Sequence, residues 1–134
     1  MSGLGAELFA LLRSLELPAG DYAVFGSGPM IVRGMVEATN DLDIITRGAA
    51  WERVQEIGTL VAFDDNNPYV DMFDGRITFG ITWKYGEFDL DELIDTAEII
   101  DGLPFVLMEH VITYKQAAGR PKDLEHLERL AELG

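Results

Sequence analysis

The chain of 134 residues has no cysteine, only five prolines and only ten basic residues against 24 acidic ones. The lack of cysteine excludes a disulfide framework, a zinc site built on thiolates and a cysteine nucleophile, and it is compatible with a reducing cytoplasm. The net charge of −14 predicts a surface that repels nucleic acid and anionic membranes, unless the few positive residues gather in one place. Nucleic acid is therefore not the expected partner.

Long hydrophobic runs are also missing. Residues 1–17 alternate apolar positions with Glu7, Arg13 and Glu16, a spacing that predicts an amphipathic helix rather than a signal peptide or a membrane span. We therefore expect a cytoplasmic protein that does not contact a membrane. No repeat, low-complexity tract or Pro/Gly/Ser-rich linker interrupts the chain, so residues 1–134 are expected to form a single domain.

Short apolar segments alternate with turn-forming residues, and this order predicts an α/β (α+β) fold. The expected sheet is mixed and flanked by helices, because the last two strands should pair antiparallel whereas the earlier ones alternate with helices. Residues 64–71 are expected to form a loop. The expected strands are residues 22–25, 42–46, 60–63, 76–83 and 86–93, and the expected helices are residues 1–17, 49–58, 106–119 and two helices that begin at Pro29 and Pro121.

Two aspartates stand one residue apart where the second strand begins. Because side chains two residues apart share one face of a strand, Asp41 and Asp43 should project together while Leu42 and Ile44 enter the core. Neighbouring carboxylates repel each other unless a cation lies between them, and carboxylate oxygens suit Mg²⁺. The pair predicts a magnesium site, with two solvated acids at the start of a strand as the alternative.

A glycine–serine turn precedes these aspartates in the chain. The strand at residues 22–25 runs into Gly26 and Ser27, and a helix is expected to begin at Pro29. Backbone N–H groups at such a helix start bind anions, so we predict that Gly26 and Ser27 contact phosphates, with a simple tight turn as the alternative. The turn does not match the P-loop, which requires a lysine, or the dinucleotide-binding pattern, which requires glycine where Ile31 stands.

Together the two motifs resemble a known family pattern. A strand that ends in Gly-Ser, a helix, and an Asp-Leu-Asp separated from Ser27 by thirteen residues are similar to the hG[GS] and Dh[DE]h motifs of the nucleotidyltransferase superfamily. The resemblance implies the minimal polymerase-β-like fold and a reaction that moves an NMP from an NTP to an acceptor hydroxyl. It also implies that Asp41 and Asp43 bind Mg²⁺, or Mn²⁺ in its place, together with a third carboxylate from a later strand.

Three acids are candidates for that third carboxylate, which would orient or deprotonate the acceptor. Asp89 is the first choice because it lies on the predicted strand at residues 86–93. Glu87 shares the face of Asp89 by period-two spacing, and Asp91 is a further candidate. Residues 64–101 contain eleven acidic and two basic residues, so an ordinary surface acid is the alternative for each.

The C-terminal "KQAAGRPKD" carries a second likeness. It resembles the "K.aaGRpKD" segment of nucleotidyltransferases related to the AbiEii abortive-infection toxins, and the likeness implies that Lys115, Arg120 and Lys122 contact the nucleotide. Three of the ten positive residues fall within these eight positions, where an acidic protein would have to concentrate a phosphate-binding surface. The alternatives are an exposed helix face for the two lysines and an ion pair between Arg120 and Asp123.

One position departs from the family pattern. Many relatives carry an arginine four residues before the first metal aspartate and a threonine two residues later, whereas this chain has Glu37 and Thr39. Since a glutamate cannot bind phosphate, Arg33, one helical turn earlier, is the candidate replacement. A degenerate domain that binds a nucleotide or serves as a protein-interaction module is therefore the alternative to an active enzyme.

Charge bears on the choice of acceptor, and the family resemblance bears on the biological context. Acidity favours a small-molecule or protein acceptor over RNA, and the resemblance implies a resistance or toxin–antitoxin setting. The chain has no added helical domain to hold the acceptor, so loops, a second subunit in a homodimer or a partner protein would complete that site. His110 and His126 lie on different predicted helices without a partner at ligand spacing, so neither is expected to bind metal or to serve as a base for Ser27.

Overall fold

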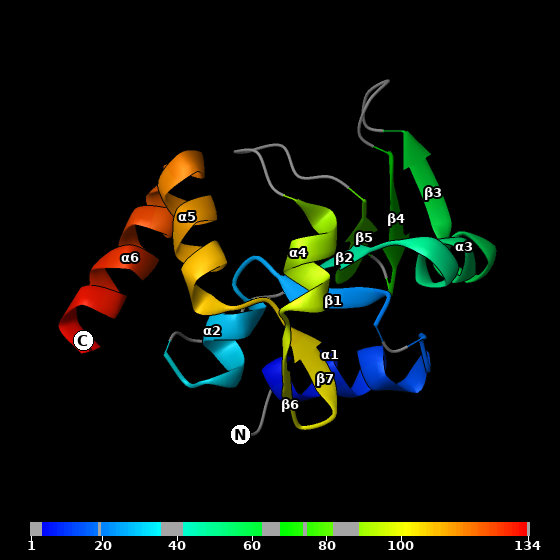
Figure 1. The fold of residues 1–134 in the computed structure, drawn as a ribbon, viewed down its shortest axis with the longest axis horizontal. Coiled ribbons are helices and arrows are strands. Elements are labelled where there is room, and N and C mark those ends of the chain that lie inside the picture. Colours follow the sequence, from blue (N-terminus) through cyan, green and yellow to red (C-terminus); the bar gives the residue numbers. More distant parts are fainter. Residues whose placement is uncertain are drawn as a thin grey trace.

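A mixed seven-stranded sheet forms the centre of the molecule (Figure 1). The computed structural model describes residues 4–18, 20–35, 42–62, 68–73, 75–81 and 89–133. Within these residues the strands lie in the order β3-β4-β5-β2-β1-β7-β6. The strands are β1 (Tyr22–Phe25), β2 (Leu42–Thr46), β3 (Thr59–Ala62), β4 (Pro68–Met72), β5 (Ile77–Gly80), β6 (Glu98–Ile100) and β7 (Leu103–Phe105). The helices are α1 (Leu4–Ser14), α2 (Gly28–Val32), α3 (Gly48–Ile57), α4 (Leu90–Asp95), α5 (Met108–Ala118) and α6 (Pro121–Leu133).

The pairing directions confirm the predicted mixed α/β architecture with helices at the C-terminal end. Strand β1 is antiparallel to β2 and parallel to β7, and β2 is parallel to β5. The β3–β4, β4–β5 and β6–β7 pairs are antiparallel. The central position of β1 explains why all four of its residues are buried, since helices cover both faces of the sheet there.

Two hydrophobic clusters lie on opposite sides of the sheet. Helices α1 and α3 cover one side and contribute Leu8, Leu12 and Val54 to its core. Helices α4 and α5 cover the other side and contribute Leu93 and Val111. Figure 1 shows α6 beside α5 at the left edge of the molecule. None of the described helices has the length and apolar character that crossing a membrane requires.

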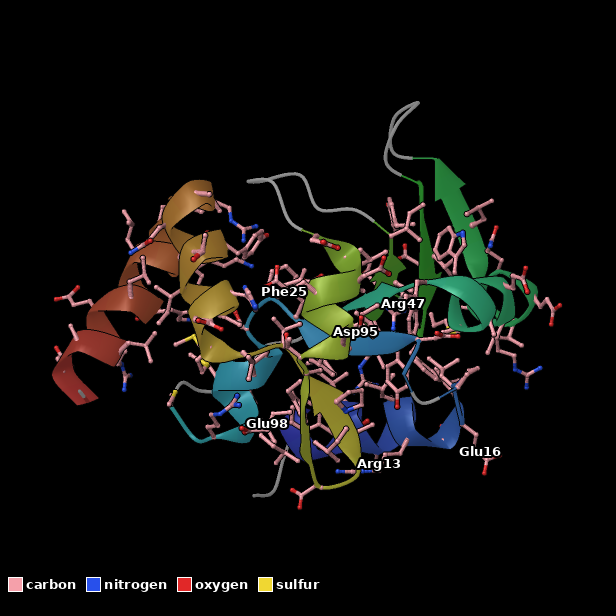
Figure 2. All side chains as sticks on the ribbon, in the orientation of Figure 1. Arg13, Glu16, Phe25, Arg47, Asp95 and Glu98 are labelled. Carbon is pink, nitrogen blue, oxygen red and sulfur yellow. The ribbon has the colours of Figure 1, made fainter. Side chains whose placement is uncertain are left out.

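Arg47 ties α4 to the sheet at the start of α3. Its guanidinium donates to Asp91 Oδ1 at 2.7 Å, to Asp95 Oδ1 at 2.5 Å and to the backbone oxygen of Gly20 at 2.7 Å. Figure 2 shows Arg47 and Asp95 facing each other between α4 and β2. These bonds raise the pKa of Arg47 above its ordinary value, and they fix how α4 lies over the β1 and β2 strands.

The structure corrects two predicted segments. Residues 68–71, expected within the loop at residues 64–71, belong to β4. The preceding turn-forming residues led to the loop prediction, although "YVDM" alternates as a strand does. The strand predicted over residues 86–93 is wrong from Asp89 onward: Asp89 is the N-cap of α4, and residues 86–88 lie outside the described residues. Asp89 Oδ1 accepts hydrogen bonds from Asp91 N and Glu92 N, a typical aspartate N-cap that favours a helix over a strand.

The β6–β7 hairpin was not predicted, although the sequence carries its signal. Its turn residues Asp101 and Gly102 have φ values of +51° and +82°. Positive φ at both central residues is the requirement of a type I′ turn, which Asp-Gly meets well. A search for Asp-Gly between apolar residues would have found this hairpin.

Candidate functional site

The predicted magnesium ligand Asp43 lies directly against the predicted phosphate turn. Asp43 pairs with Phe25, the last residue of β1, and Gly26 follows. Gly26 has φ +61°, and a Cβ atom built on it would come within 2.7 Å of Asp43 Oδ2. Only glycine fits both the left-handed conformation and this close approach. The glycine at this position therefore lets the carboxylate of β2 reach the backbone of the turn.

A row of polar side chains extends from Asp43 across the sheet. Asp43 lies opposite Thr78 of β5, Thr78 lies opposite Asp71 of β4, and Asp71 lies opposite Thr59 of β3. Directly opposite residues share a face, so these four side chains form what we call the polar row. Thr78 Oγ1 donates to Asp71 Oδ1 at 3.2 Å, which holds the Asp71 carboxylate toward β5 and therefore toward Asp43.

The polar row lies on the same side of the sheet as α4 and α5. Asp43 stands two residues before Ile45, which belongs to the cluster beneath those helices. Its neighbours Leu42 and Ile44 belong to the cluster on the opposite side and are 1% and 0% exposed, as the period-two spacing predicted. Asp71 and Asp43 are two strand spacings apart, which places their Cα atoms roughly 10 Å from each other.

A second group of polar side chains contacts the turn at Gly26 and Ser27 through Ser27 itself. We call it the lysine cluster, and its members are Ser27, Lys115, Asp123 and His126. Lys115 of α5 is 1% exposed, and its Nζ lies 3.1 Å from Ser27 Oγ, 2.9 Å from His126 Nδ1 and 3.4 Å from Asp123 Oδ1. Three acceptors match the three N–H groups of an ammonium. Lys115 therefore brings its amino group to the turn formed by Gly26 and Ser27, and the exposed helix face considered for it is wrong.

The lysine cluster fixes the roles of its hydrogen-bonding groups. An ammonium can only donate, so a charged Lys115 requires His126 Nδ1 to be the acceptor and the ring proton to reside on Nε2. Ser27 Oγ accepts from Lys115, and its own hydroxyl proton can be donated either to His126 Nδ1, 3.4 Å away, or to a ligand oxygen. A hydroxyl whose oxygen is held by an ammonium is well placed to donate to a phosphate oxygen.

Burial shifts the pKa of two members of the cluster. It lowers the pKa of Lys115 from its ordinary value, although the Asp123 carboxylate acts in the opposite direction. It also lowers the pKa of His126, and the positive charge of Lys115 adds to that effect. A second proton on the His126 ring would have to sit on Nδ1, where it would face the ammonium.

The corner between α5 and α6 contains the predicted ion pair between Arg120 and Asp123. Arg120 Nε donates to Asp123 Oδ2 at 2.6 Å, and Arg120 also contacts the Tyr114 hydroxyl at 3.2 Å. Asp123 is fully buried; burial alone would raise its pKa, but the bond and charge of Arg120 hold the pKa below its ordinary value. Gly119 closes α5 with φ +59°, the left-handed cap that allows the tight corner. Within the described residues, hydrogen bonds link Arg120 to the turn through Asp123 and Lys115.

The other predicted site residues do not gather at the turn in the described part of the chain. Asp41 and Glu87 lie outside the described residues. Asp89 is exposed at the start of α4, where one of its oxygens caps the helix, and Lys122 is exposed on α6. Among the described residues, no three acidic or histidine side chains surround a common point. Arg33, the candidate replacement for the missing arginine, instead pairs with Glu98 at 2.9 Å.

Sequence reasoning missed three residues of this region. The prediction that Ser27 has no histidine nearby is wrong, since His126 Nδ1 lies 3.4 Å from Ser27 Oγ. The Asp123–His126 spacing of three residues on one helix face was the available signal. Asp71 and Thr78 were also missed, although "VDM" repeats the apolar–acid–apolar pattern of "LDI". A hydrolase triad does not follow, because Lys115 occupies His126 Nδ1 and Asp123.

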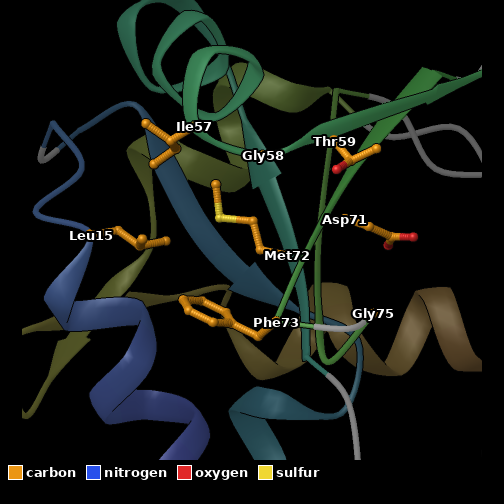
Figure 3. A pocket seen from close by; sticks show the side chains of 8 residues that line it. All are labelled: Leu15, Ile57, Gly58, Thr59, Asp71, Met72, Phe73 and Gly75. Carbon is orange, nitrogen blue, oxygen red and sulfur yellow. The ribbon is translucent and has the colours of Figure 1, made fainter.

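A cavity of about 580 Å³ lies elsewhere, between the ends of α1 and α3 (Figure 3). Leu15, Ile57, Met72 and Phe73 project toward one another around it, whereas Asp71 projects to the other side of β4. Asp71 and Thr59 of the polar row also line the cavity, but the Asp71 side chain points away from Met72 and Phe73. It belongs to neither of the predicted motifs.

Comparison of the chain with protein-family models, with curated proteins and with solved structures finds no match. The resemblance to nucleotidyltransferases therefore depends on the motifs themselves.

Proposed function

We propose that this chain is an Mg²⁺-dependent nucleotidyltransferase that moves an NMP from an NTP to an acceptor hydroxyl. The contact between the Asp43 carboxylate and Gly26 carries the proposal, because it brings a metal-binding group and a phosphate-binding turn to one place. The Lys115 ammonium, 3.1 Å from Ser27 Oγ, adds positive charge there in a protein with a net charge of −14. An acidic protein needs such a local charge to hold a triphosphate.

The donor set suits a hard cation. Asp43 supplies a carboxylate beside the turn, and Asp41, outside the described residues, is proposed as its partner; oxygen donors of this kind fit Mg²⁺ or Mn²⁺. When bound, the ion would neutralise the triphosphate and polarise the α-phosphate. Asp71, oriented toward β5 by Thr78, is the described acid that best supplements the pair, because it shares the face of Asp43. Asp89 remains the second candidate, with one oxygen engaged in capping α4.

The reaction would be an in-line displacement. The acceptor oxygen forms a bond to the α-phosphorus as the bond from that phosphorus to the pyrophosphate oxygen breaks. The acceptor proton passes to a carboxylate, for which Asp71 or Asp89 is proposed. Ser27 donates its hydroxyl proton to a β- or γ-phosphate oxygen while Lys115 holds its oxygen. A small molecule or a protein is the proposed acceptor, in a resistance or toxin–antitoxin context, because the negative surface disfavours RNA.

Calorimetric titration with each of the four NTPs, with and without Mg²⁺, tests the proposal. We expect magnesium-dependent binding to the native chain and at least a hundredfold weaker binding to Asp43→Asn, since the replaced group loses its charge but little of its shape. Glu52→Gln, an exposed change on α3, is the matched control and should bind as the native chain does. The same titration on Asp71→Asn and Asp89→Asn identifies which acid supports the ion.

Two outcomes would count against the proposal. Absence of NTP binding by the native chain at any magnesium concentration would rule out the site in the isolated protein. Equal binding by the native chain and Asp43→Asn would leave a nucleotide-binding module without the metal chemistry. In either case we would abandon the hypothesis of a nucleotidyltransferase in favour of a binding or interaction domain.

A further inference from the structure

The lysine cluster connects the turn that is proposed to bind phosphate with the last helix, which has no part in the proposed reaction. Ser27 belongs to the turn proposed to hold phosphate, whereas His126 lies on the last helix, 99 residues away. Lys115 bridges them, and its side chain is 1% exposed. The Ser27 hydroxyl and the His126 ring therefore share one hydrogen-bonding partner, the Lys115 amino group.

We propose that His126 is a positioning residue of the phosphate turn: its neutral ring holds the Lys115 ammonium against Ser27, and protonation of the ring breaks this arrangement and weakens nucleotide binding. The ligand in this inference rests on the proposed function, whereas the contact between His126, Lys115 and Ser27 does not. The proposed class of ligand is a nucleoside triphosphate with its metal ion.

The geometry leaves no room for a doubly protonated ring. Nδ1 of His126 is 2.9 Å from Lys115 Nζ, so a proton on Nδ1 would point at another donor. Two positive charges at that distance, with little water between them, repel strongly. Either the ring must turn away or Lys115 must lose its proton, and both changes alter the hydrogen bonding of the Lys115 amino group that holds Ser27 Oγ.

Charged groups from every neighbouring element bear on the ring. Lys115 of α5 and Lys122 of α6 oppose its protonation, whereas Asp123 and Glu125 of α6 favour it. Ser27, the contact from the turn before α2, is uncharged. Burial and Lys115 prevail, so the pKa of His126 lies below its ordinary value of 6.5.

The sign of the pH effect follows from this lowered pKa. Between pH 6.5 and the lower pKa of the folded protein, the unfolded chain binds a proton at His126 that the folded chain does not. The stabilising contribution is therefore complete above pH 6.5 and is lost as the pH falls below it. Nucleotide affinity should follow the same direction and weaken about tenfold per pH unit once the ring is protonated.

The test uses two variants and two measurements on the full chain. His126→Asn places an amide oxygen near the position of Nδ1 and does not titrate, whereas His126→Leu removes the acceptor. His110→Asn on α5 is the matched control for loss of a histidine. The first measurement follows the backbone amide signals of Ser27 and Gly28 by NMR from pH 7.5 to pH 5, without any ligand; the second is calorimetric binding of Mg²⁺ and ATP over the same range.

We expect the Ser27 and Gly28 signals to shift with a midpoint below pH 6.5 in the native chain and in His110→Asn, and to stay constant in His126→Asn. ATP affinity should fall more steeply with falling pH in the native chain than in His126→Asn, where only the titration of the triphosphate itself remains, and it should be low at every pH in His126→Leu. An equal shift of the two signals in His126→Asn, or no shift in the native chain, would overturn the inference. If ATP fails to bind at pH 7.5, the proposed function fails, while the ligand-free NMR result still decides the role of His126.

Discussion

At the scale of single residues, Gly26 combines a conformational constraint with a steric one. Its φ of +61° is costly for any other residue, and a Cβ there would meet the Asp43 carboxylate at 2.7 Å. Gly102, with φ +82°, has no described atom within 4 Å of the corresponding position. The two glycines thus share the conformational requirement, and only Gly26 adds a steric one.

We expect Gly26→Ala to lower the free energy of unfolding by about 2–4 kcal/mol and Gly102→Ala by about 1 kcal/mol, because only the first adds a steric clash to the left-handed conformation. Urea denaturation followed by circular dichroism measures both. In the Asp43→Ala background the extra cost of Gly26→Ala should shrink, since the clashing oxygen is gone. Equal losses at the two glycines would mean that the carboxylate moves aside without cost.

At the scale of elements, the lysine cluster and Arg120 fasten α5 and α6 to each other and to the turn before α2. The pair formed by Lys115 and Asp123 is 1% and 0% exposed at its side chains, so neither charge is screened by water. A buried pair of this kind adds little net stability over apolar residues of similar size, but removal of one partner leaves the other buried and unpaired. Substitution of one member of the pair should therefore destabilise the corner between α5 and α6 more than substitution of both members.

Asp123→Ala should destabilise the chain by about 3–5 kcal/mol, because it leaves the Lys115 ammonium without its carboxylate and Arg120 without its main partner. The paired change Lys115→Met with Asp123→Asn should restore much of that loss. Glu125→Ala, an exposed change on the same helix, should stay within about 0.5 kcal/mol of the native value. Thermal and urea unfolding give the comparison, and a paired variant no more stable than Asp123→Ala would contradict the argument.

At the scale of the whole molecule, charge is the dominant feature. Ten basic residues cannot neutralise 24 acidic ones, and Lys115, Arg47 and Arg120 are each engaged with carboxylates inside the fold. The remaining negative charge repels itself and destabilises the compact state. It also slows the approach of an anionic ligand at low ionic strength.

The melting temperature should consequently rise when NaCl increases from low to physiological concentration, because screening weakens the repulsion among surface acids. Differential scanning calorimetry at neutral pH measures the change, with sucrose at matched osmolarity as a control for general solute effects. A fall in melting temperature would show that ion pairs such as those of Arg47 outweigh the global repulsion. Labelled DNA should show no binding even at the lowest salt concentration.

The sequence by itself determined those features that depend on local pattern. Apolar runs placed β1 and β2, and Pro29, Gly119 and Pro121 marked helix ends, because burial and backbone constraints act over a few residues. Gly26 and Asp43 were related in advance through the resemblance to the family pattern, and the structure pairs their two strands. Where local signals conflicted, the predictions were wrong: β4 was expected to be a loop, and the start of α4 at Asp89 was expected to be a strand.

Only the tertiary structure decided which distant residues meet. Asp71 and Thr78 join Asp43 through strand register, and His126 reaches Ser27 through the packing of α5 and α6 on the sheet. The sequence around Lys115 suggested either an exposed position on a helix or a contact with phosphate. The burial of Lys115 and its three hydrogen-bond partners instead follow from the packing of α5 and α6. Hydrophobic periodicity reports which side of an element is buried and not what covers it, so sequence could point to the phosphate turn but not to the residues that support it.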